Sequence, residues 1–411
     1  MKKIVFILVA VMLIATAGVG CRKADDSQKD IDYSDFEAVL EAARGTSVTF
    51  YGWGGDMAIN SWLDNVVGSA LLQQYDIRLN RVPMNIDDIL NKLMGEKQAQ
   101  VEKGDIDVVW INGENFYTAM EANLLFGPFT QYVRNYGIYL NPEDADLHYD
   151  FGTPIEGMEV PYGRAQLVFI GDSTIIDSFP VNAGQLLDLA KKHPGKITYA
   201  APPDFTGSAF VRNILCDIVG FEAIFNAPAD EEALYEVIKP GLDFLVKLKP
   251  YLWQEGLTYP ADSPAAEQMF IDGLIIMNIS YTPLRAAQQI MAGEYPNTAQ
   301  TFVFANGNIG NTHYMAIPYN APNIAGALAL VNHIISPEIQ ITKYDAGNWG
   351  DLPVFDVSRL DSGQRAQLDA VDNGIGILTP DELFAHRLPE VQANKIPIIE
   401  SLWERHVLHA N

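Results

Sequence analysis

Apolar residues recur with two different periods along the chain, and this predicts strands that alternate with helices. Residues 48–51 form a β-type run, and from 59 to 71 the apolar positions take the three- and four-residue spacing of a helix. A second strand is expected over 77–82 and a second helix over 86–93. Residues 106–111 are almost continuously apolar, as in a strand buried on both faces of a parallel sheet. This order predicts a parallel sheet with right-handed crossovers.

The same alternation resumes after a long extended segment, which predicts a second lobe. Residues 158–176 are expected to pass between the lobes as one strand, and residues 313–317 as another. We therefore predict an α/β fold with two lobes, each a mostly parallel sheet flanked by helices, joined by two extended hinge segments. The first lobe is expected to span 36–160, with 318–411 returning to it, and the second lobe 161–317.

The N-terminal residues predict export. Two lysines precede an apolar run, and small residues lead up to Cys21, which is typical of a secretory signal peptide over residues 1–20. A cysteine at the cut favours lipidation of Cys21, as in bacterial lipoproteins, although Gly18 stands where that pattern prefers leucine. An uncleaved anchor and ordinary cleavage nearby are the alternatives. Residues 21–35 are mostly polar and are expected to form a lipidated, flexible tether.

Charge and cysteine content narrow the classes of partner. The 411 residues hold 27 Lys and Arg against 52 Asp and Glu, which gives a net charge of −25. An acidic chain repels phosphate backbones, so nucleic acid is not expected as a partner, whereas a small molecule, a cation or a basic protein surface is. With only Cys21 and Cys216, the chain has neither a disulfide-rich scaffold nor a metal site built from four cysteines.

The common catalytic motifs are missing from the sequence. It contains no phosphate-binding loop, no zinc-protease motif and no serine-hydrolase elbow. His406 and His409 are three residues apart, but near the C-terminus they do not indicate a metal site. We therefore expect no metal, no cofactor and no enzymatic activity.

Three glycine-containing loops follow predicted strands and precede predicted helices, at residues 52–56, 112–116 and 204–208. Open α/β sheets bind ligands at the carboxyl ends of their strands, where glycine lets the backbone approach a ligand. Ordinary turns with helix caps would explain each loop singly, and Asp56 and Asp204 stand where caps belong. Three such loops divided between two lobes favour a binding site.

The loop sequences resemble a known family. The stretches Phe50-Tyr51-Gly52-Trp53-Gly54-Gly55, Trp110-Ile111-Asn112-Gly113-Glu114-Asn115-Phe116, Leu125-Phe126-Gly127-Pro128 and Ala201-Pro202-Pro203-Asp204-Phe205 are the ones that carry the resemblance. They are similar to the YnjB-type branch of the type II extracellular solute-binding proteins of ABC importers, which is related to binding proteins for thiamine, polyamines and iron. The resemblance spans about residues 36–410. It implies an exported, monomeric, membrane-anchored or periplasmic receptor that closes on a small solute and docks on an ABC permease.

The resemblance also implies which residues meet the solute between the lobes. These are Trp53, Gly54, Gly55, Asp56, Asn112, Gly113, Glu114, Asn115, Tyr162, Arg164, Thr206, Gly207, Asn278, Tyr281 and Trp349. Their aromatic rings and the carboxylate of Glu114 favour an organic cation such as a thiamine-like compound or a polyamine. Helix N-termini and Arg164 favour an anionic group instead, and a zwitterion would satisfy both.

Two other functions fit parts of the pattern. A secreted carbohydrate-active hydrolase would use a pair of carboxylates, which Asp56, Glu114 and Asp204 could supply. An extracellular adhesion or scaffold module would leave the loops without a purpose. The solute-binding receptor accounts for the export pattern and for the loops together.

Lipidation of Cys21 can be tested by phase partition. One acyl chain binds a membrane only marginally, with a constant on the order of 10⁴ M⁻¹, so multiple acylation of this cysteine is needed for stable anchoring. The full-length protein should enter the detergent phase of an extraction, and Cys21→Ser should move it to the aqueous phase. Equal partition of the two proteins would contradict lipidation.

Overall fold

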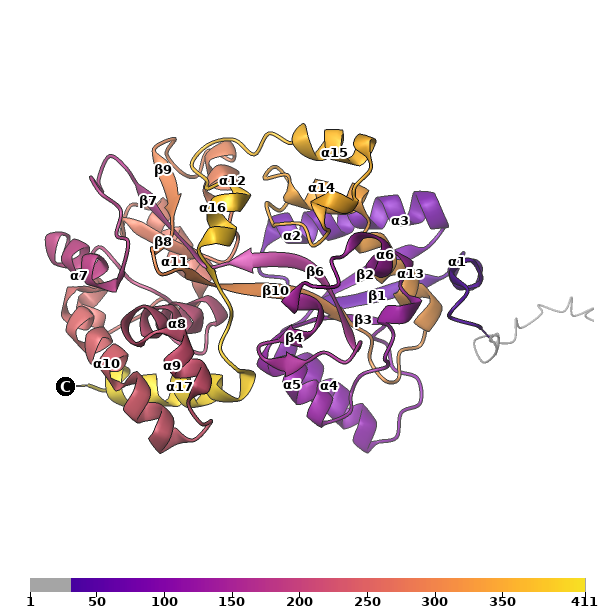
Figure 1. The fold of residues 1–411 in the computed structure, drawn as a ribbon, viewed down its shortest axis with the longest axis horizontal. Coiled ribbons are helices and arrows are strands. Elements are labelled where there is room, and N and C mark those ends of the chain that lie inside the picture. The colour runs from indigo at the N-terminus through magenta and orange to yellow at the C-terminus, as the bar shows by residue number, and fades with distance from the viewer. Residues whose placement is uncertain (1–30, 411) are drawn as a thin grey trace, which may run out of the picture.

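The computed structural model describes residues 31–410, which form two lobes joined by strands that cross between them (Figure 1). The predicted signal peptide at residues 1–20, the predicted lipidation site Cys21 and residues 22–30 of the predicted tether lie outside the described residues. Within 31–410 no single helix has the length and hydropathy to span a membrane; one pair bent by 59°, Ile324–Ile334 with Pro337–Tyr344, passes by length and composition alone.

The first lobe is a three-layer sandwich around one sheet. The strands are β1 (Ser47–Gly52), β2 (Arg78–Pro83), β3 (Val108–Ile111), β6 (Glu159–Gln166), β10 (Asn308–Ala316) and β11 (Arg387–Leu388). β1 pairs in parallel with β2 and β3, as the alternation of strands and helices predicts. In β3, Val108 packs in one apolar cluster while Val109 and Ile111 pack in another. Burial on both faces explains the continuous apolar run.

Helices cover both faces of this sheet. They are α1 (Phe36–Ala43), α2 (Met57–Ser61), the π-helical turn η2 (Trp62–Val67), α3 (Gly68–Tyr75), α4 (Ile86–Gln98), α5 (Glu114–Glu121), α6 (Arg134–Tyr139), α13 (Ile324–Ile334) and α14 (Pro337–Tyr344). α1 and α13 supply one apolar cluster, and α4 and α5 supply the other. A short hairpin, β4 (Tyr149–Asp150) with β5 (Thr153–Pro154), lies beside α5 (Figure 1).

The second lobe surrounds a smaller sheet of β7 (Val168–Asp172), β8 (Met277–Ser280) and β9 (Ala299–Phe302). β7 runs antiparallel to both neighbours, so the prediction of a mostly parallel sheet is wrong for this lobe. The reason is that β7 continues directly from the crossing strand β6, which gives it the direction opposite to that of β8 and β9. Residues 197–201 are mostly buried but form no strand.

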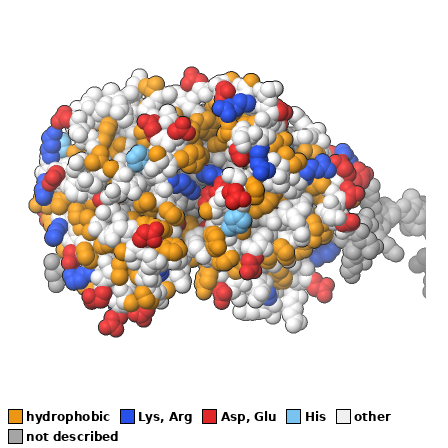
Figure 2. All heavy atoms as spheres, viewed as in Figure 1, with side chains coloured by type: hydrophobic (Ala, Val, Ile, Leu, Met, Phe, Trp, Pro, Cys, Tyr) orange, Lys and Arg blue, Asp and Glu red, His pale blue; other side chains and the backbone are white. Residues whose placement is uncertain are grey.

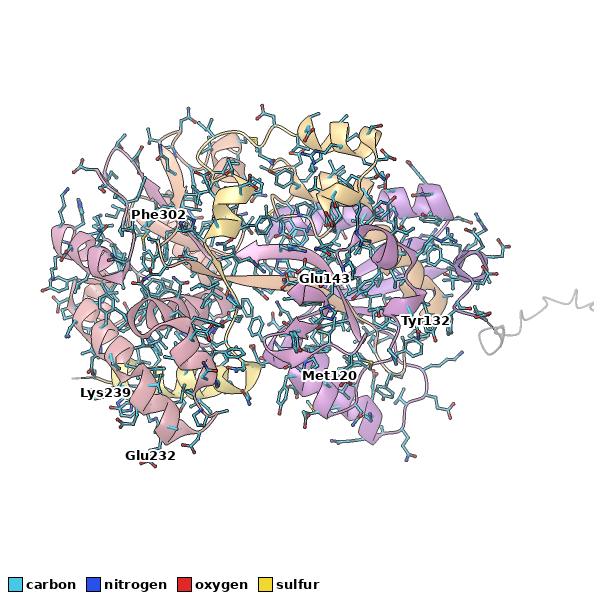
Figure 3. The ribbon with its side chains drawn as sticks, in the orientation of Figure 1. Met120, Tyr132, Glu143, Glu232, Lys239 and Phe302 are labelled. Carbon is cyan, nitrogen blue, oxygen red and sulfur yellow. The ribbon has the colours of Figure 1, made fainter. Side chains whose placement is uncertain are left out.

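Helices again cover both faces of the second sheet. They are α7 (Ala183–Lys192), α8 (Phe205–Val219), α9 (Phe221–Asn226), α10 (Glu231–Leu248), α11 (Ser263–Ile271) and α12 (Arg285–Met291). Phe302 of β9 lies over Phe169, with ring centroids 5.3 Å apart, inside this lobe. Figure 3 shows it far from Met120 in the first lobe, while Glu232 and Lys239 of α10 mark the outer edge of the second.

Two adjacent strands carry the chain between the lobes. β6 and β10 pair antiparallel from Glu159 and Ala316 to Gln166 and Gly310, with a register shift at His313/Tyr314. Their first-lobe ends, at Val160 and Met315, pack in the core of that lobe, whereas Leu167 and Ile309 pack in the core of the other. The prediction of two extended hinge segments is confirmed, and the structure adds that they are hydrogen-bonded neighbours.

After β6 and β10, the C-terminal part of the chain makes a third crossing between the lobes. This differs from the expectation that 318–411 returns entirely to the first lobe. After α15 (Ser362–Asp369) and α16 (Pro380–Ala385), the helix α17 (Ile396–Trp403) packs in the second lobe. Its apolar face meets α8 and α10, and Trp403 Nε1 donates to Tyr199 Oη at 3.0 Å. The apolar residues of this segment follow a helical period, but that pattern does not show which lobe completes the apolar face of the helix.

A buried ion pair supports the hinge where β6 passes Gly163. Lys343 Nζ donates to Asp351 Oδ2 at 2.8 Å and to the carbonyls of Tyr162 and Leu352, also at 2.8 Å. Burial lowers the pKa of Lys343 to about 8, although Asp351 opposes this shift. A Cβ at Gly163 would lie 2.2 Å from Asp351 Oδ2 and 2.9 Å from Lys343 Nζ. Glycine is therefore required here because the ion pair touches the backbone.

Gly163→Ala should destabilise the protein by about 3 kcal/mol or more, because the methyl group separates a buried ion pair. Urea unfolding of the variant measures this free energy. Gly95→Ala is the matched control, since a Cβ there meets nothing within 4 Å inside helix α4. It should stabilise the protein by about 0.5–1 kcal/mol. An unfolding midpoint for Gly163→Ala at or above that of the parent would contradict this account of the hinge.

Candidate functional site

A cleft of about 810 Å³ lies between the lobes, with residues 53–62 of the first lobe on one side and 263–292 of the second on the other. A second cavity of about 380 Å³ shares part of its lining and extends toward the sheet of the first lobe. The shared residues are Trp53, Gly55, Ile59, Thr206, Ser263, Pro264, Tyr281 and Thr282. We treat the two cavities as one interlobe cleft.

The loop after β1 brings its side chains to the cleft. Asp56 caps α2, because its Oδ1 accepts from the backbone N–H groups of Ala58 and Ile59 at 2.8 and 3.1 Å. Trp53 is 43% exposed and folds over Gly55, where a Cβ would lie 2.3 Å from the indole ring. Gly54 packs on Pro83 and does not line the cleft. The glycines therefore shape the loop and the position of Trp53.

The loop after β3 divides between the cleft and the interior. Asn112 and Asn115 line the cleft. Gly113 has φ 61°, and its N–H donates to the buried carboxylate of Asp150. Glu114 is not among the lining residues; burial raises its pKa to about 7, and Arg212 opposes this shift. The interpretation of Glu114 as the group that meets a cation in the cleft does not fit this position.

The second lobe contributes Thr206, Asn278 and Tyr281 to the cleft. Asp204 caps α8 by accepting from Gly207 N at 2.8 Å, and it also accepts from Ser263 Oγ at 2.6 Å. Gly207 is in close contact with the chain, since a Cβ would lie 1.9 Å from the Ala200 carbonyl. Its role is packing, whereas Thr206 beside it faces the cleft.

The two hinge residues expected at the solute lie elsewhere. Tyr162 is fully buried between Phe50, Trp110 and Trp349. Arg164 forms an ion pair with Asp144 and lines a separate cavity of about 520 Å³ that shares no residue with the cleft. Their position in β6 was predicted, but the direction of a side chain at a hinge depends on the twist of the strand pair.

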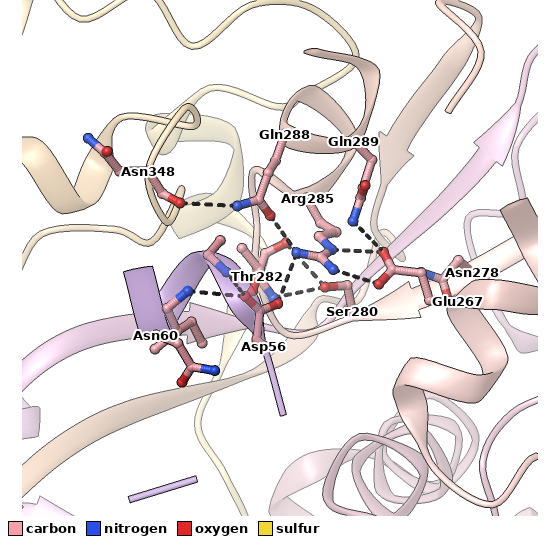
Figure 4. A network of polar contacts seen from close by, with 12 residues as sticks. Asp56, Asn60, Glu267, Asn278, Ser280, Thr282, Arg285, Gln288, Gln289 and Asn348 are labelled. Atoms are coloured by element: carbon pink, nitrogen blue, oxygen red, sulfur yellow. Dashed lines mark hydrogen bonds and ion pairs between the residues drawn. The ribbon is translucent and has the colours of Figure 1, made fainter. Parts of the chain in front are cut away.

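Arg285 is the centre of a polar network that the sequence did not reveal (Figure 4). It donates to both carboxylate oxygens of Glu267, at 2.7 and 2.6 Å, and to Asp56 Oδ2 across the cleft at 3.0 Å. Burial opposes its charge, but Glu267 and Asp56 hold the pKa of Arg285 above its usual range. Arg285 begins a helix just after β8, a position that could have indicated it; Glu267 lies within α11, where no sequence pattern marks it.

Aromatic rings form the floor of the cleft. Trp110, His313 and Trp349 all line it, with His313 stacked on Trp349 at 5.6 Å and edge-on to Trp110 at 4.9 Å. Burial lowers the pKa of His313 to about 4, so the imidazole is neutral at physiological pH. Phe205 and Tyr281 add a second aromatic pair from the other lobe. Trp110 and His313 were not predicted as site residues, since both lie within strands.

The charges in the cleft are mostly negative. The charged residues among its lining are Asp56, Asp204, Asp262, Glu267 and Arg285. On the face seen in Figure 2, acidic and basic side chains are interspersed with hydrophobic ones and form no broad basic patch. Among residues 31–410, no group of three or more His, Cys, Asp or Glu side chains could hold a metal ion. The arrangement is suited to holding an organic molecule between aromatic faces and polar groups.

Comparison with known proteins places this architecture. The family of bacterial extracellular solute-binding proteins matches residues 68–368. Protein YnjB of Escherichia coli strain K12 is 35% identical over 339 residues, which is 82% of this chain and 87% of YnjB. The periplasmic binding protein AfuA from Actinobacillus pleuropneumoniae, with fructose-6-phosphate bound, superposes with a TM-score of 0.60 at 14% identity, covering 89% of this chain and 99% of AfuA. A periplasmic thiamin binding protein superposes with a TM-score of 0.59 at 18% identity, covering 88% and 96%.

Glu114 should make stability depend on pH. Its pKa is about 7 in the folded protein, against about 4.5 when exposed, so the folded state binds the extra proton between these values. Stability should therefore fall as pH rises from about 4.5 to 7. Glu114→Gln should remove this loss, and at pH 8 it should exceed the parent in unfolding free energy by about 3 kcal/mol.

Urea unfolding at pH 5 and pH 8 measures the effect. Glu121→Gln, at an exposed position of the same helix, is the control and should follow the parent at both pH values. If the unfolding free energies of Glu114→Gln and the parent differ by the same amount at pH 5 and at pH 8, Glu114 does not titrate in this range.

Proposed function

The chain belongs to the bacterial extracellular solute-binding proteins, and from this premise we propose that its cleft captures a small organic cation. The protein is the solute-binding component of an ABC importer, with the two-lobed fold of periplasmic binding proteins. The observation that supports the proposal is the lining of the cleft, where four carboxylates and one guanidinium surround aromatic rings.

Helix N-termini do not make this cleft attractive to anions. α2, α8 and α11 begin at its edge, and each is capped by the carboxylate of Asp56, Asp204 or Asp262. A capping carboxylate satisfies the free N–H groups and neutralises the positive end of the helix dipole. An anionic solute would therefore meet negative charge at three points where an uncapped helix would bind it. A cation, or the cationic end of a zwitterion, is instead attracted by these three carboxylates.

The proposed contacts follow from the lining. Trp53 and Tyr281 supply aromatic faces on opposite lobes, and Trp349 completes the floor. Polar contacts are proposed from Asp56, Asn112, Asn115, Thr206 and Asn278, and backbone contact from Gly55. Gly54, Gly113, Glu114, Tyr162, Arg164 and Gly207 are proposed to shape the site without touching the solute.

The structurally similar proteins differ in the solute that they bind. The thiamin binding protein takes a cationic ring, in agreement with the proposal, whereas AfuA holds fructose-6-phosphate, an anionic sugar. At 14–18% identity these proteins share the fold alone, and the mostly negative lining of the cleft in this chain supports a cationic solute.

The family and the N-terminal sequence support a location outside the cytoplasm. The protein is exported, and we propose that lipid on Cys21 holds it at the outer face of the membrane or in the periplasm, where the closed form delivers solute to an ABC permease as a monomer. A hydrolytic function receives no support from the comparisons. Two of the carboxylates it would need, Asp56 and Asp204, are engaged as helix caps.

A thermal-shift panel tests the cation proposal. The probes are thiamine, its phosphates, putrescine, amino acids, sugars and phosphate. A cationic probe at about 100 times its Kd should stabilise the protein by roughly 2.7 kcal/mol. Trp53→Leu should weaken the binding of that probe about 2- to 30-fold, because it removes one cation–π contact worth about 0.5–2 kcal/mol.

Tyr117→Leu provides the control, because Tyr117 is 37% exposed on α5 and does not line the cleft. It should bind the probe as the parent does. Stabilisation by a sugar or by phosphate alone would overturn the cation proposal.

A further inference from the structure

Arg285 joins the two lobes through unequal contacts. Within the second lobe, Nε and Nη2 form a two-pronged pair with Glu267 at 2.7 and 2.6 Å. Across the cleft, Nη1 forms a single hydrogen bond with Asp56 Oδ2 at 3.0 Å. Because bidentate pairs are stronger than single contacts, Arg285 stays with Glu267 when the lobes separate. The contact with Asp56 is then the one that depends on lobe closure.

The donors of Arg285 are all engaged by this chain. Nη1 also donates to Gln288 Oε1 at 2.5 Å. With the amide of Gln289 turned so that its oxygen faces the guanidinium, Nη2 reaches that oxygen at 2.8 Å. A guanidinium has five N–H groups, and these contacts use all of them. An anionic group could reach Arg285 only by displacing Asp56 or Glu267.

Displacing either carboxylate is unfavourable because both are largely shielded from water. The side chains of Asp56, Glu267 and Arg285 are 14–15% exposed. A partly buried carboxylate that loses its cation keeps the cost of desolvation without the gain of pairing. Asp56 would still cap α2 through Oδ1, so it could not turn away to water without releasing Ala58 and Ile59.

We propose that Arg285 is a specificity-determining residue: held by Glu267, it pairs with Asp56 when the lobes close and admits only solutes that leave this bridge intact. This inference rests on the proposed function for the class of solute, but the bridge itself is independent of which solute binds. An anionic solute breaks the bridge and opposes closure. A neutral or cationic group leaves it in place, and closure then adds the bridge to the contacts with the solute.

Asp56→Asn isolates the bridge, because asparagine caps a helix about as well as aspartate but cannot form the ion pair. The distance between the lobes is measured by double electron–electron resonance. Spin labels are placed at Leu72→Cys on α3 and Leu257→Cys in the second lobe, which are 44% and 75% exposed. The full chain carries Cys21→Ser in addition, and Cys216 is buried. Asp56→Asn should raise the ratio of long to short distances about tenfold, the effect of one charge-assisted hydrogen bond.

Asp35→Asn is the matched control, since Asp35 caps α1 through two backbone N–H groups and lies outside the cleft. Its distance distribution should equal that of the parent. An Asp56→Asn distribution that superposes on the parent would overturn the bridge, whatever the thermal-shift panel shows.

Selectivity is tested with sulfate as the probe, by titration calorimetry. Glu267→Gln leaves donors of Arg285 without a charged partner, so sulfate should bind this variant at least about tenfold more tightly than the parent. Arg285→Gln in the same background should abolish the gain. Equal sulfate affinity in Glu267→Gln and the parent would overturn the assignment of Arg285 as the residue that excludes anions.

Discussion

The antiparallel pairing of β6 with β10 is the constraint on which the rest of the structure depends. Each strand begins in one core and ends in the other, so the position of one lobe relative to the other depends on this ladder. The Lys343–Asp351 pair contacts this ladder at Tyr162 and Gly163 and sits directly beneath the aromatic floor of the cleft. The strands that join the lobes and the aromatic floor of the cleft therefore meet at the same few residues.

The cleft uses aspartates for two purposes. Asp56, Asp204 and Asp262 start helices, and the same residues give the cleft its negative charge. Many α/β proteins leave helix N-termini open toward phosphate or carboxylate groups. Here the capping groups are part of the lining, so the residues that begin these helices also set the charge of the cleft. Arg285 lies in the same lobe as Asp204 and Asp262 and pairs with Asp56 of the opposite lobe, so one negative charge of the cleft is paired across it.

The sequence predicted what depends on local pattern. Strand β3, the caps Asp56 and Asp204 and the crossing strands follow from hydrophobic period and turn chemistry, which neighbouring residues determine. Glu114 was misplaced because its helix begins at the cleft while its side chain turns inward, and one sequence does not show that direction. Glu267 was missed because it meets Arg285, which in turn pairs with Asp56, only through tertiary packing. Likewise, helical periodicity indicates the apolar face of α17, but it does not indicate the lobe on which that face packs.

The position of α17 has a consequence for the order in which the molecule becomes folded. The residues of the second core extend along the sequence from Phe151, which precedes the crossing strand β6, to Val407, close to the C-terminus. The first lobe in turn needs α13, which follows the whole second lobe in the chain. Neither core can be completed until almost the entire polypeptide has emerged, and domains made of distant segments fold slowly for that reason. A chain exported from its N-terminus would thus complete both lobes late and nearly together.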